Sequence, residues 1–261
     1  MKAVLSIAGS DSSGGAGIQA DIKTIAAQGL FAETALTALT AQNTTGVTGV
    51  FAVDPDFVAA QIDAVFEDIR PDAVKIGMVS SSDIITAIAD ALERQGARNI
   101  VLDPVMVATS GARLIDEGAV EALRTRLLPL AAVATPNMPE AEVLCDRAVN
   151  DDATMELAAL MLADGSRAVL VKGGHRSDAA DDVLVEADGT VTWMRGSRID
   201  TKNTHGTGCT LSSAIACGLA EGLDVVAAVR RARTYVRGAL AAGLDLGRGS
   251  GPLDHMWEHR R

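Results

Sequence analysis

The sequence predicts an α/β fold, in which a mainly parallel central sheet carries helices on both faces. Short apolar runs alternate with stretches whose apolar residues recur at helical spacing, which is the pattern of strands joined by crossover helices. Apolar residues make up 48% of the chain and aromatic residues only 3%, so aliphatic side chains would fill a closely packed core. No internal repeat or long linker divides residues 1–261, and we expect them to form a single domain.

Six strands are expected where a short apolar run ends in a polar or glycine-rich turn. The helices between them begin at signals such as Asp54-Pro55, which places a capping side chain before the first helical turn. The helix from residue 54 has an apolar stripe of Phe57, Ile62, Val65 and Ile69. The expected strands are residues 4–8, 31–41, 73–76, 99–102, 131–134 and 168–171, and the other helices are residues 16–28, 82 onward, 116–127, 139–145 and 153–163.

The pattern changes in the last third of the chain. Residues 182–186 and 190–194 flank an Ala-Asp-Gly turn, which is typical of a β-hairpin. A polar, glycine-containing stretch over residues 200–210 leads into a long helix, and a further helix is expected over residues 225–242.

Charge and cysteine content exclude several classes of protein. The formal net charge is −11 and no Lys/Arg cluster offsets it, which argues against a nucleic-acid partner. Three scattered cysteines do not form a disulfide framework, and no CxxC or Cys/His cluster indicates a structural zinc. No apolar run reaches membrane-spanning length and residues 1–7 are too short for a signal peptide, so we expect a soluble, cytoplasmic protein. Cys145 and Cys217 are expected in the core, and His255 and His259 on the surface.

Polar or small residues directly follow each expected strand. Because the carboxyl ends of parallel strands meet at one edge of a sheet, and ligands bind there, we expect these residues to form one composite site. Each of them alone fits an ordinary turn, but six such places from distant parts of the chain favour a common ligand. They are Gly9-Ser10-Asp11, Gln42-Asn43, Gly77-Met78, Asp103, Asn137 and Lys172.

The stretch over residues 200–210 suits an anion. Its glycines would let the backbone N–H groups of Gly206, Thr207, Gly208 and Cys209 approach a ligand closely, and a helix N-terminus adds about half a positive charge. Cys209 would lie in the first helical turn, where a thiol ionises more easily than in water. The alternative is an N-capping loop before a core helix, with Cys209 as a small apolar residue.

Two motifs at strand ends allow both structural and functional interpretations. Asn137 and Glu140 mark a helix start, which needs no ligand, but together with Asp103 their oxygens could hold Mg²⁺–phosphate through water. Lys172 lies between Val171 and two glycines, and is either a solvated surface side chain or a phosphate-binding one.

Common nucleotide-binding fingerprints are absent or weak. The P-loop pattern GxxxxGK[ST] does not occur. Residues 15–20 match G-x-G-x-x-G/A loosely, but Gly15 comes too late after the first strand, and Gln42-Asn43 stand where a ribose-binding carboxylate is expected. The spacing argues against a Rossmann oxidoreductase, which NADH fluorescence on mixing would distinguish.

Eight stretches together carry a family resemblance: residues 8–21 (AGSDSSGGAGIQAD), 38–44 (ALTAQNT), 75–78 (KIGM), 102–106 (LDPVM), 135–142 (TPNMPEAE), 171–175 (VKGGH), 200–210 (DTKNTHGTGCT) and 251–253 (GPL). From end to end the chain resembles the hydroxymethylpyrimidine/phosphomethylpyrimidine kinases of thiamine biosynthesis, within the ribokinase-like superfamily. The matches are less specific between pyrimidine-directed and pyridoxal-directed members of that family. Thr109 departs from the family pattern, which has Lys there, and puts an anion contact from that loop in doubt.

The resemblance implies a ribokinase-like three-layer sandwich that transfers the ATP γ-phosphoryl group. The acceptors would be 4-amino-5-hydroxymethyl-2-methylpyrimidine and then its monophosphate. ATP is the implied co-substrate and Mg²⁺ the implied cofactor, K⁺ is a possible additional cation, and a homodimer is expected. The resemblance assigns catalysis to Cys209, Gly206, Thr207 and Gly208; the pyrimidine to Gly9, Asp21, Gln42, Met78 and Val105; the nucleotide to Lys172, Asn137, Glu140 and Thr204; and Mg²⁺, through water, to Asp103 and Glu140.

Alternatives remain for the activity and for two residues. Pyridoxal kinase is the rival activity, while the intact Gly206 loop and Glu140 argue against a catalytically silent regulator. Related sugar kinases place an aspartate base where this chain has Cys209, so the thiol would take the hydroxymethyl proton unless positioning alone suffices. Gln42 would select the ring, because its amide donor and acceptor match an aminopyrimidine edge. Otherwise Gln42 ends a strand and bonds its own loop.

Overall fold

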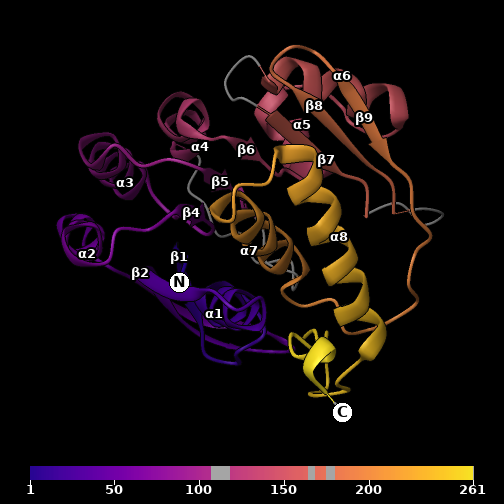
Figure 1. The fold of residues 1–261 in the computed structure, drawn as a ribbon, viewed down its shortest axis with the longest axis horizontal. Helices are drawn as coiled ribbons and strands as arrows, with labels where there is room; N and C mark the ends of the chain where they lie inside the picture. The colour runs from indigo at the N-terminus through magenta and orange to yellow at the C-terminus, as the bar shows by residue number, and fades with distance from the viewer. Residues whose placement is uncertain (107–117, 164–167, 175–179, 261) are drawn as a thin grey trace.

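The computed structural model describes residues 1–106, 118–163, 168–174 and 180–260, and its strands form one continuous sheet (Figure 1). The described strands are β1 (Ala3–Asp11), β2 (Phe31–Asn43), β3 (Gly46–Ala52), β4 (Ala73–Ile76), β5 (Ile100–Leu102), β6 (Val133–Ala134), β7 (Ala168–Lys172), β8 (Asp182–Glu186) and β9 (Val191–Met194). Their order is β3-β2-β1-β4-β5-β6-β7-β8-β9. The central six pair in parallel, whereas β3 at one edge and β8 and β9 at the other are antiparallel.

Helices cover both faces of this sheet and make a three-layer sandwich (Figure 1). One face carries α1 (Gly17–Ala27), α7 (Thr207–Ala220) and α8 (Val225–Ala242). The other face carries α2 (Pro55–Asp68), α3 (Ser82–Gln95), α4 (Ala119–Ala122), α5 (Met138–Cys145) and α6 (Asp152–Ala163). Short helical turns follow α4 at η1 (Leu123–Leu127) and η2 (Leu128–Leu130), and end the chain at η3 (Trp257–His259). None of the described helices has both the length and the apolar character needed to cross a bilayer.

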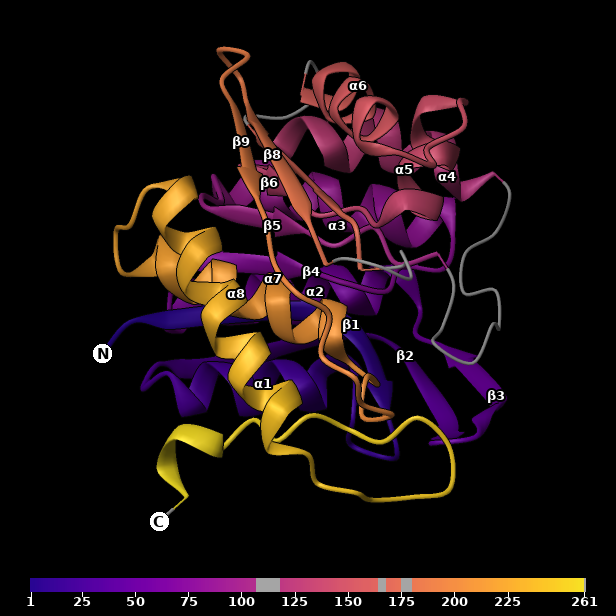
Figure 2. The ribbon, with the colours of Figure 1, turned by 90° about the vertical axis from the view of Figure 1, so that its right-hand side faces the viewer.

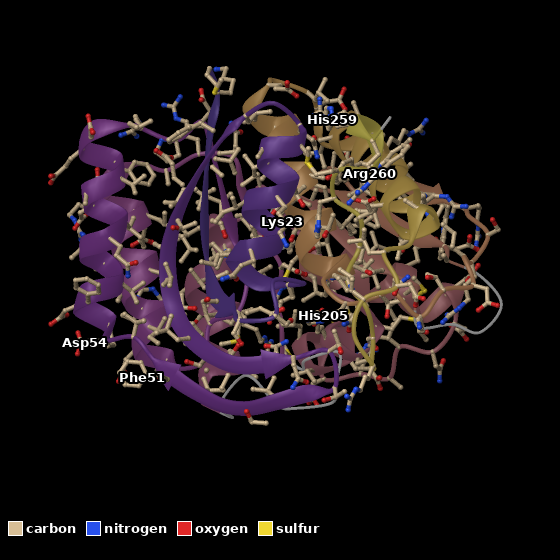
Figure 3. The ribbon with its side chains drawn as sticks, turned by 90° about the horizontal axis from the view of Figure 1, so that it is seen from below. Lys23, Phe51, Asp54, His205, His259 and Arg260 are labelled. Carbon is tan, nitrogen blue, oxygen red and sulfur yellow. The ribbon has the colours of Figure 1, made fainter. Side chains whose placement is uncertain are left out.

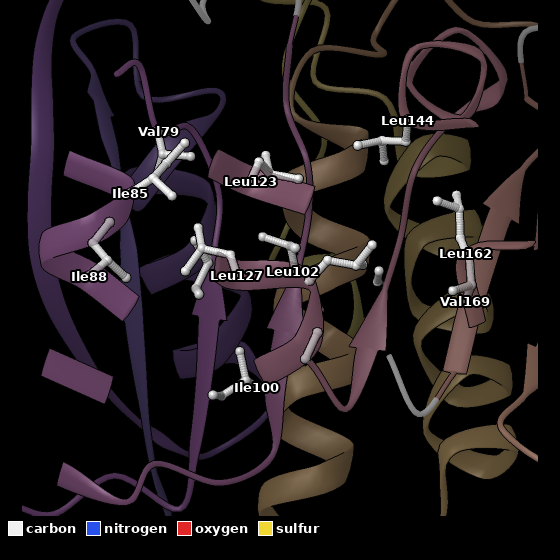
Figure 4. Close-up of a cluster of buried hydrophobic side chains, with 14 of the residues drawn as sticks. Val79, Ile85, Ile88, Ile100, Leu102, Leu123, Leu127, Leu144, Leu162 and Val169 are labelled. Carbon is white, nitrogen blue, oxygen red and sulfur yellow. The ribbon is translucent and has the colours of Figure 1, made fainter. Parts of the chain in front are cut away.

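Side-chain alternation along the strands divides the core into two clusters, one on each face. Leu5 of β1 belongs to the cluster under α2 and α3, whereas its neighbour Val4 belongs to the cluster under α1 and α7. Figure 4 shows the first cluster, in which Leu127 lies between Ile88 of α3 and Leu102 of β5 in this view. Both faces of the central strands are therefore buried, which explains why their sequences are continuously apolar.

The start of α2 is as predicted, but its apolar stripe is not. Asp54 caps the helix, and its carboxylate accepts hydrogen bonds from two backbone N–H groups. Ile62 and Phe66 are buried, whereas Phe57 is 62% exposed and Ile69 is 46% exposed. The buried face is thus rotated from the predicted one and follows Val58, Ile62 and Phe66, because the helix packs against both β2 and α3.

Four further elements differ from the sequence prediction. The sequence predicts no strand over β3, because Gly46 and Gly49 interrupt the apolar pattern. In the structure most side chains of β3 are exposed. β3 pairs with the outer half of β2 and extends a two-stranded ribbon at the edge of the molecule (Figure 2). β1 and β2 are longer than predicted and include Asp11 and Gln42. The predicted helix over 116–127 begins outside the described residues, and its described part is α4 followed by η1.

The C-terminal segment packs back onto the helices and does not fray (Figure 2). His255, predicted on the surface, is buried, with its Nε2 3.0 Å from the Thr210 hydroxyl and its carbonyl accepting from the Tyr235 hydroxyl at 2.6 Å. Burial, together with Lys23, lowers the pKa of His255 to about 4. His259 is exposed as predicted. Cys217 is buried and Cys145 is half-buried.

Candidate active site

A cavity of about 710 Å³ lies at the carboxyl ends of the parallel strands, within the size range of small-molecule sites. This is the edge at which the sequence places its composite site. Of the fourteen residues assigned to the site from the sequence, all but Asp21 line the cavity. They are Gly9, Gln42, Met78, Asp103, Val105, Asn137, Glu140, Lys172, Thr204, Gly206, Thr207, Gly208 and Cys209.

The loop before α7 is held in a conformation that only glycine adopts easily. Gly206 is the N-cap of α7 with φ 87°, and the carbonyl oxygen of Gly15 occupies the space that a side chain at Gly206 would need. The Thr207 hydroxyl donates to the carbonyl of Thr204 at 2.7 Å and closes the turn. At such a helix start the first N–H groups have no intrahelical acceptor, so those of Gly208 and Cys209 are left for a ligand.

Gly208 is needed for a different reason, because its backbone lies close to the side chains of Asp103 and Lys172. It lies within α7, and a Cβ atom there would be 3.3 Å from Oδ2 of Asp103 and 3.5 Å from Nζ of Lys172. The helix N-terminus therefore lies directly against this charged pair. The geometry brings backbone N–H groups, an ammonium and a carboxylate together at one point of the cavity.

Cys209 does not have the easily ionised thiol that the sequence predicts. Burial raises the pKa of the Cys209 thiol to about 11, and nearby Asp21 and Asp103 add to the rise. Lys75 and the backbone N–H of Gly17 act in the opposite direction but do not compensate. The helix N-terminus favours the thiolate, yet the loss of water around the thiol outweighs it, and Cys209 is a neutral thiol at neutral pH.

Asp103 and Lys172 form an ion pair at the middle of the cavity. Nζ of Lys172 lies 2.9 Å from Oδ1 of Asp103, which also accepts from the Thr135 hydroxyl at 3.1 Å. Burial alone would raise the pKa of the Asp103 carboxyl, but Lys172 and Lys75 hold it below its usual value. Burial would likewise lower the pKa of Lys172, yet Asp103 and Glu140 raise it. Both groups are charged at neutral pH.

Asn137 and Glu140 form the helix start that the sequence predicts as one of two alternatives. The Asn137 side chain accepts from the Glu140 N–H at 2.9 Å, and the Glu140 carboxylate accepts from the Asn137 N–H at 2.8 Å, which is a complete capping box. Both residues also line the cavity. Burial raises the pKa of Glu140 to about 7, with repulsion from Asp103 adding to the rise and Lys172 opposing it.

Asp21 is the predicted site residue that the structure places elsewhere. It is fully buried beneath the site, where its carboxylate accepts from Nζ of Lys75 at 2.8 Å and from the hydroxyls of Ser6 and Ser213 at 2.6 and 2.7 Å. All of these partners come from other elements of the fold. The assignment of Asp21 to substrate contact is wrong for this geometry, because the side chain has no surface on the cavity.

Gln42 lines the cavity beside Asp11, which the sequence places in the composite site, and His205, which the sequence does not assign to it. Its amide Nε2 is 3.4 Å from Nε2 of His205, which lies 2.7 Å from Oδ2 of Asp11, and its Oε1 is 3.1 Å from the Thr40 hydroxyl. Asp11 and His205 are 194 positions apart in sequence. The position of Asp11 at a strand end places it in the site, but no local sequence signal pairs it with His205.

Another part of the cavity is lined by α8, which the sequence did not assign to the site. Arg233 pairs with Asp182 at 2.8 Å, and Arg237 donates to the carbonyl of Ser197 at 2.7 Å. Val236 and Leu240 add an apolar surface on the same helix. The basic, amphipathic pattern of residues 225–242 was the available signal. The departure at Thr109 and the motif residue His175 lie outside the described residues.

Comparison with known proteins identifies the family. The family model described as phosphomethylpyrimidine kinase matches residues 11–254. The hydroxymethylpyrimidine/phosphomethylpyrimidine kinase of Rhizobium meliloti is 52% identical, over 97% of this chain and 96% of that protein. The corresponding kinase of Escherichia coli is 47% identical, over 97% and 96%. The bifunctional thiamine biosynthesis protein ThiED of Geobacter sulfurreducens is 52% identical across 97% of this chain but 52% of its own length.

Solved structures of related kinases have the same fold. An ADP complex of Bacillus subtilis pyridoxal kinase is similar with a TM-score of 0.92 and 35% identity, covering 100% of both chains. Phosphomethylpyrimidine kinase from Clostridium difficile has a TM-score of 0.81 and 42% identity, covering 91% of this chain and 98% of that one. The three-layer α/β prediction is confirmed, and the fold is ribokinase-like. The chain belongs to the phosphomethylpyrimidine kinase family.

Proposed function

We propose that this protein transfers the γ-phosphoryl group of ATP to the hydroxymethyl group of 4-amino-5-hydroxymethyl-2-methylpyrimidine, and then phosphorylates the monophosphate. The observation that carries the proposal is the position of the α7 N-terminus. It lines one cavity together with Gln42, Lys172 and residues of α8, and Gly208 lies directly against Lys172. A ring beside Gln42, the ring end of the cavity, and a nucleotide beside Lys172 and α8 would meet at Gly208 and Cys209.

Phosphoryl transfer depends on positioning and on stabilisation of charge more than on covalent help. The free N–H groups at the start of α7 would bind the oxygens of the transferred group as their charge develops. Lys172, already charged and next to Gly208, would shift toward the phosphate when nucleotide binds. Asp103 would keep that ammonium in place between turnovers.

Cys209 would position the acceptor hydroxyl and would not remove its proton. A base must be ionised to take a proton, and a thiol whose pKa is about 11 is neutral at pH 7. In a loose transition state the hydroxyl proton leaves late, so a strong base is not required. Cys209 would therefore hold the hydroxymethyl oxygen in line with the γ-phosphorus.

The residues around Asp103 and Glu140 fit a magnesium ion. Two carboxylates, of Asp103 and Glu140, and the Lys172 ammonium lie close together in a buried place. Burial and repulsion from Asp103 raise the pKa of Glu140 to about 7. A divalent cation nearby would lower that pKa again. Carboxylate oxygens are the ligands that Mg²⁺ prefers, usually with several waters. When bound, Mg²⁺ would neutralise phosphate charge. Among the described residues no group of three His, Cys, Asp or Glu side chains surrounds a common point, so the ion would be held largely through water and nucleotide.

Gln42 provides the direct test of substrate choice. An aminopyrimidine edge presents a ring-nitrogen acceptor beside an amino donor, and one carboxamide can bond both. Gln42→Leu should lower kcat/KM for the hydroxymethylpyrimidine about ten- to a hundredfold, because buried polar groups lose their partners. Any activity on pyridoxal should hardly change. Equal losses on both substrates would mean that Gln42 supports the site without reading the ring. The homodimer stays a prediction, which analytical ultracentrifugation would test.

A further inference from the structure

Four side chains at the ring end of the cavity share a hydrogen-bond network whose hydrogens can be counted. Asp11 ends β1, Thr40 and Gln42 lie near the end of β2, and His205 precedes the α7 N-cap. Figure 3 shows His205 between the ends of these strands and the C-terminal segment. The carbonyl of Gly251 in that segment accepts from the backbone N–H of His205 at 3.0 Å. Each donor and acceptor in the network limits the roles of the next one.

Asp11 can only accept. Its Oδ2 receives the N–H groups of Gly15 and Ala16 at 3.1 and 2.8 Å, and its Oδ1 receives the N–H and hydroxyl of Ser13 at 2.8 and 2.7 Å. Burial would raise the pKa of the Asp11 carboxyl, but hydrogen bonds from His205, Ser13 and the backbone hold it well below its usual range. The carboxyl is therefore a carboxylate, and it carries no hydrogen to give to His205.

Nε2 of His205 must then carry the hydrogen of this contact. It lies 2.7 Å from Oδ2 of Asp11, and a ring nitrogen has room for one hydrogen only. With that hydrogen present the nitrogen cannot accept from the amide Nε2 of Gln42, 3.4 Å away. An NH2 group of Gln42 at this place would oppose one donor to another, whereas a carbonyl oxygen meets the outer side of the N–H that Asp11 already accepts. The carbonyl oxygen is therefore the end of the Gln42 amide that suits the His205 side.

Thr40 leads to the same conclusion from the other side of the amide. Its single hydroxyl hydrogen has two acceptors in reach, the carbonyl oxygen of Ser10 at 2.9 Å and Oε1 of Gln42 at 3.1 Å, and can serve only one of them. When the hydroxyl donates to Ser10, the shorter contact, no hydrogen remains for an oxygen of Gln42. The Thr40 hydroxyl oxygen still has a free lone pair, which can accept an N–H of the Gln42 amide.

We infer that the Asp11–His205 pair and Thr40 fix the Gln42 carboxamide in one of its two orientations, with Oε1 toward His205 and Nε2 toward Thr40. The two ends of a carboxamide have nearly the same shape, so the hydrogen inventory decides between them. Asp11 and His205 are thus positioning residues, which act on a substrate through Gln42. What this orientation means for the substrate rests on the proposed function.

The fixed amide sets the direction of the substrate ring. Oε1 pairs with the 4-amino group and Nε2 with ring atom N3, and the 5-hydroxymethyl group lies next to the amino group on the ring. The hydroxymethyl group is therefore placed on the His205 side of Gln42. His205 is followed directly by Gly206, the N-cap of α7. The reverse orientation of the amide would turn the hydroxymethyl group toward Thr40, away from the phosphoryl-transfer point.

A substrate with donor and acceptor exchanged tests this inference. The 4-oxo analogue of the hydroxymethylpyrimidine offers an N3–H donor beside a carbonyl acceptor, and matches only a Gln42 amide turned by 180°. The readout is discrimination, defined as kcat/KM for the amino substrate divided by kcat/KM for the oxo analogue. His205→Leu removes the Nε2–H donor, while His205→Gln keeps an amide donor of similar reach. Thr40→Val and Thr40→Ser form a second matched pair that does not alter the α7 loop.

His205→Leu should reduce the discrimination at least about tenfold, because the freed amide can turn to pair with the oxo ring. His205→Gln should keep most of the discrimination, Thr40→Val should reduce it about threefold, and Thr40→Ser should leave it near the parent value. A protein that phosphorylates the amino substrate, and whose His205→Leu and Thr40→Val variants both keep the parent discrimination, would overturn the inference. A parent that cannot phosphorylate the amino substrate would overturn the proposed function, and with it this consequence.

Discussion

Two Lys–Asp pairs lie beneath the same helix N-terminus and differ in their surroundings. The side chains of Lys75 and Asp21 are both 0% exposed, and Nζ lies 2.8 Å from Oδ2. In the second pair Asp103 is 1% exposed but Lys172 is 15% exposed, on the cavity, with Nζ 2.9 Å from Oδ1. The Lys75–Asp21 pair is closed to ligands, whereas the Lys172–Asp103 pair is open to them.

The difference shows how one type of interaction serves two purposes in one site. Asp21 also accepts from two serine hydroxyls, so the closed pair joins β1, α1, β4 and α7 and has no capacity left for a ligand. Lys172 has only Asp103 as an ion-pair partner in the described structure, with Glu140 adding negative charge nearby. The closed pair should therefore determine stability, and the open pair should determine turnover.

The largest expected effect comes from breaking the closed pair. Lys75→Met should lower the free energy of unfolding by about 3–5 kcal/mol, because it leaves the Asp21 carboxylate buried without a counter-charge. Urea denaturation measures this loss. The double variant Lys75→Met/Asp21→Asn should recover most of it, since the isolated charge is then gone. A loss below about 1 kcal/mol in the single variant would show that the closed pair is not a stabilising link.

Breaking the open pair should have the opposite pattern. Lys172→Met should lower kcat by about a hundred- to a thousandfold, because it removes a donor to the transferred phosphoryl group. The free energy of unfolding should fall less than in Lys75→Met, since Asp103 keeps Lys75 as a nearby cation. Initial rates with saturating ATP test the first part. A rate within threefold of the parent would return Lys172 to a structural role.

Cys209 is close enough to both pairs for Lys75, Asp21 and Asp103 to shift its pKa, and it should have an intermediate effect. Cys209→Ala should lower kcat about tenfold through lost positioning, with little change in ATP affinity, because the anion site uses backbone. For the parent, kcat should be flat between pH 7 and 9, since the thiol stays neutral below its pKa of about 11. A rate that rises tenfold per pH unit in the parent, but not in the alanine variant, would instead identify the thiolate as a base.

Glu140 should produce the smallest effect and one with a defined sign. Its pKa is raised to about 7, so in the absence of Mg²⁺ the folded state binds more protons than the unfolded state between about pH 4.5 and 7. Stability should therefore fall as pH rises through that window, by on the order of 1 kcal/mol more in the parent than in Glu140→Gln. Thermal or urea unfolding at pH 5 and 7 measures the difference. Equal slopes in parent and variant would contradict the raised pKa.

The same variant sharpens the comparison with the open pair. Glu140→Gln should raise the Mg²⁺ concentration needed for half-maximal rate, because one carboxylate near the nucleotide phosphates loses its charge. Binding of the free pyrimidine should stay unchanged. An unchanged Mg²⁺ dependence would leave Glu140 with only its capping role at α5.

The site positions that depend on local signals could be predicted from the sequence. Gln42, Asp103 and Lys172 each end or follow an apolar strand, and parallel strands bring such ends to one edge. Gly206 could be recognised because a glycine before an apolar helix indicates a backbone anion site. These inferences need only the spacing of apolar residues within a segment and the identity of the residue at its end.

What the sequence could not predict depends on partners far apart in the chain. The pairing of Asp21 with Lys75 spans 54 positions, so a residue that looked like a substrate contact is a buried link. The raised pKa of Cys209 comes from burial by several elements, which outweighs the helix N-terminus visible in the sequence. β3 was missed because its stability comes from pairing with β2, and its own residues are mostly exposed.

The central claim is that the open pair and the α7 N-terminus transfer phosphate to an aminopyrimidine. The most direct measurement is ³¹P NMR of the protein with Mg²⁺, ATP and 4-amino-5-hydroxymethyl-2-methylpyrimidine, with pyridoxal in a parallel sample. The account predicts a pyrimidine monophosphate signal that rises and then gives way to the diphosphate, with one ADP formed for each phosphate transferred. ADP release without a pyrimidine phosphate, or phosphorylation of pyridoxal alone, would contradict it.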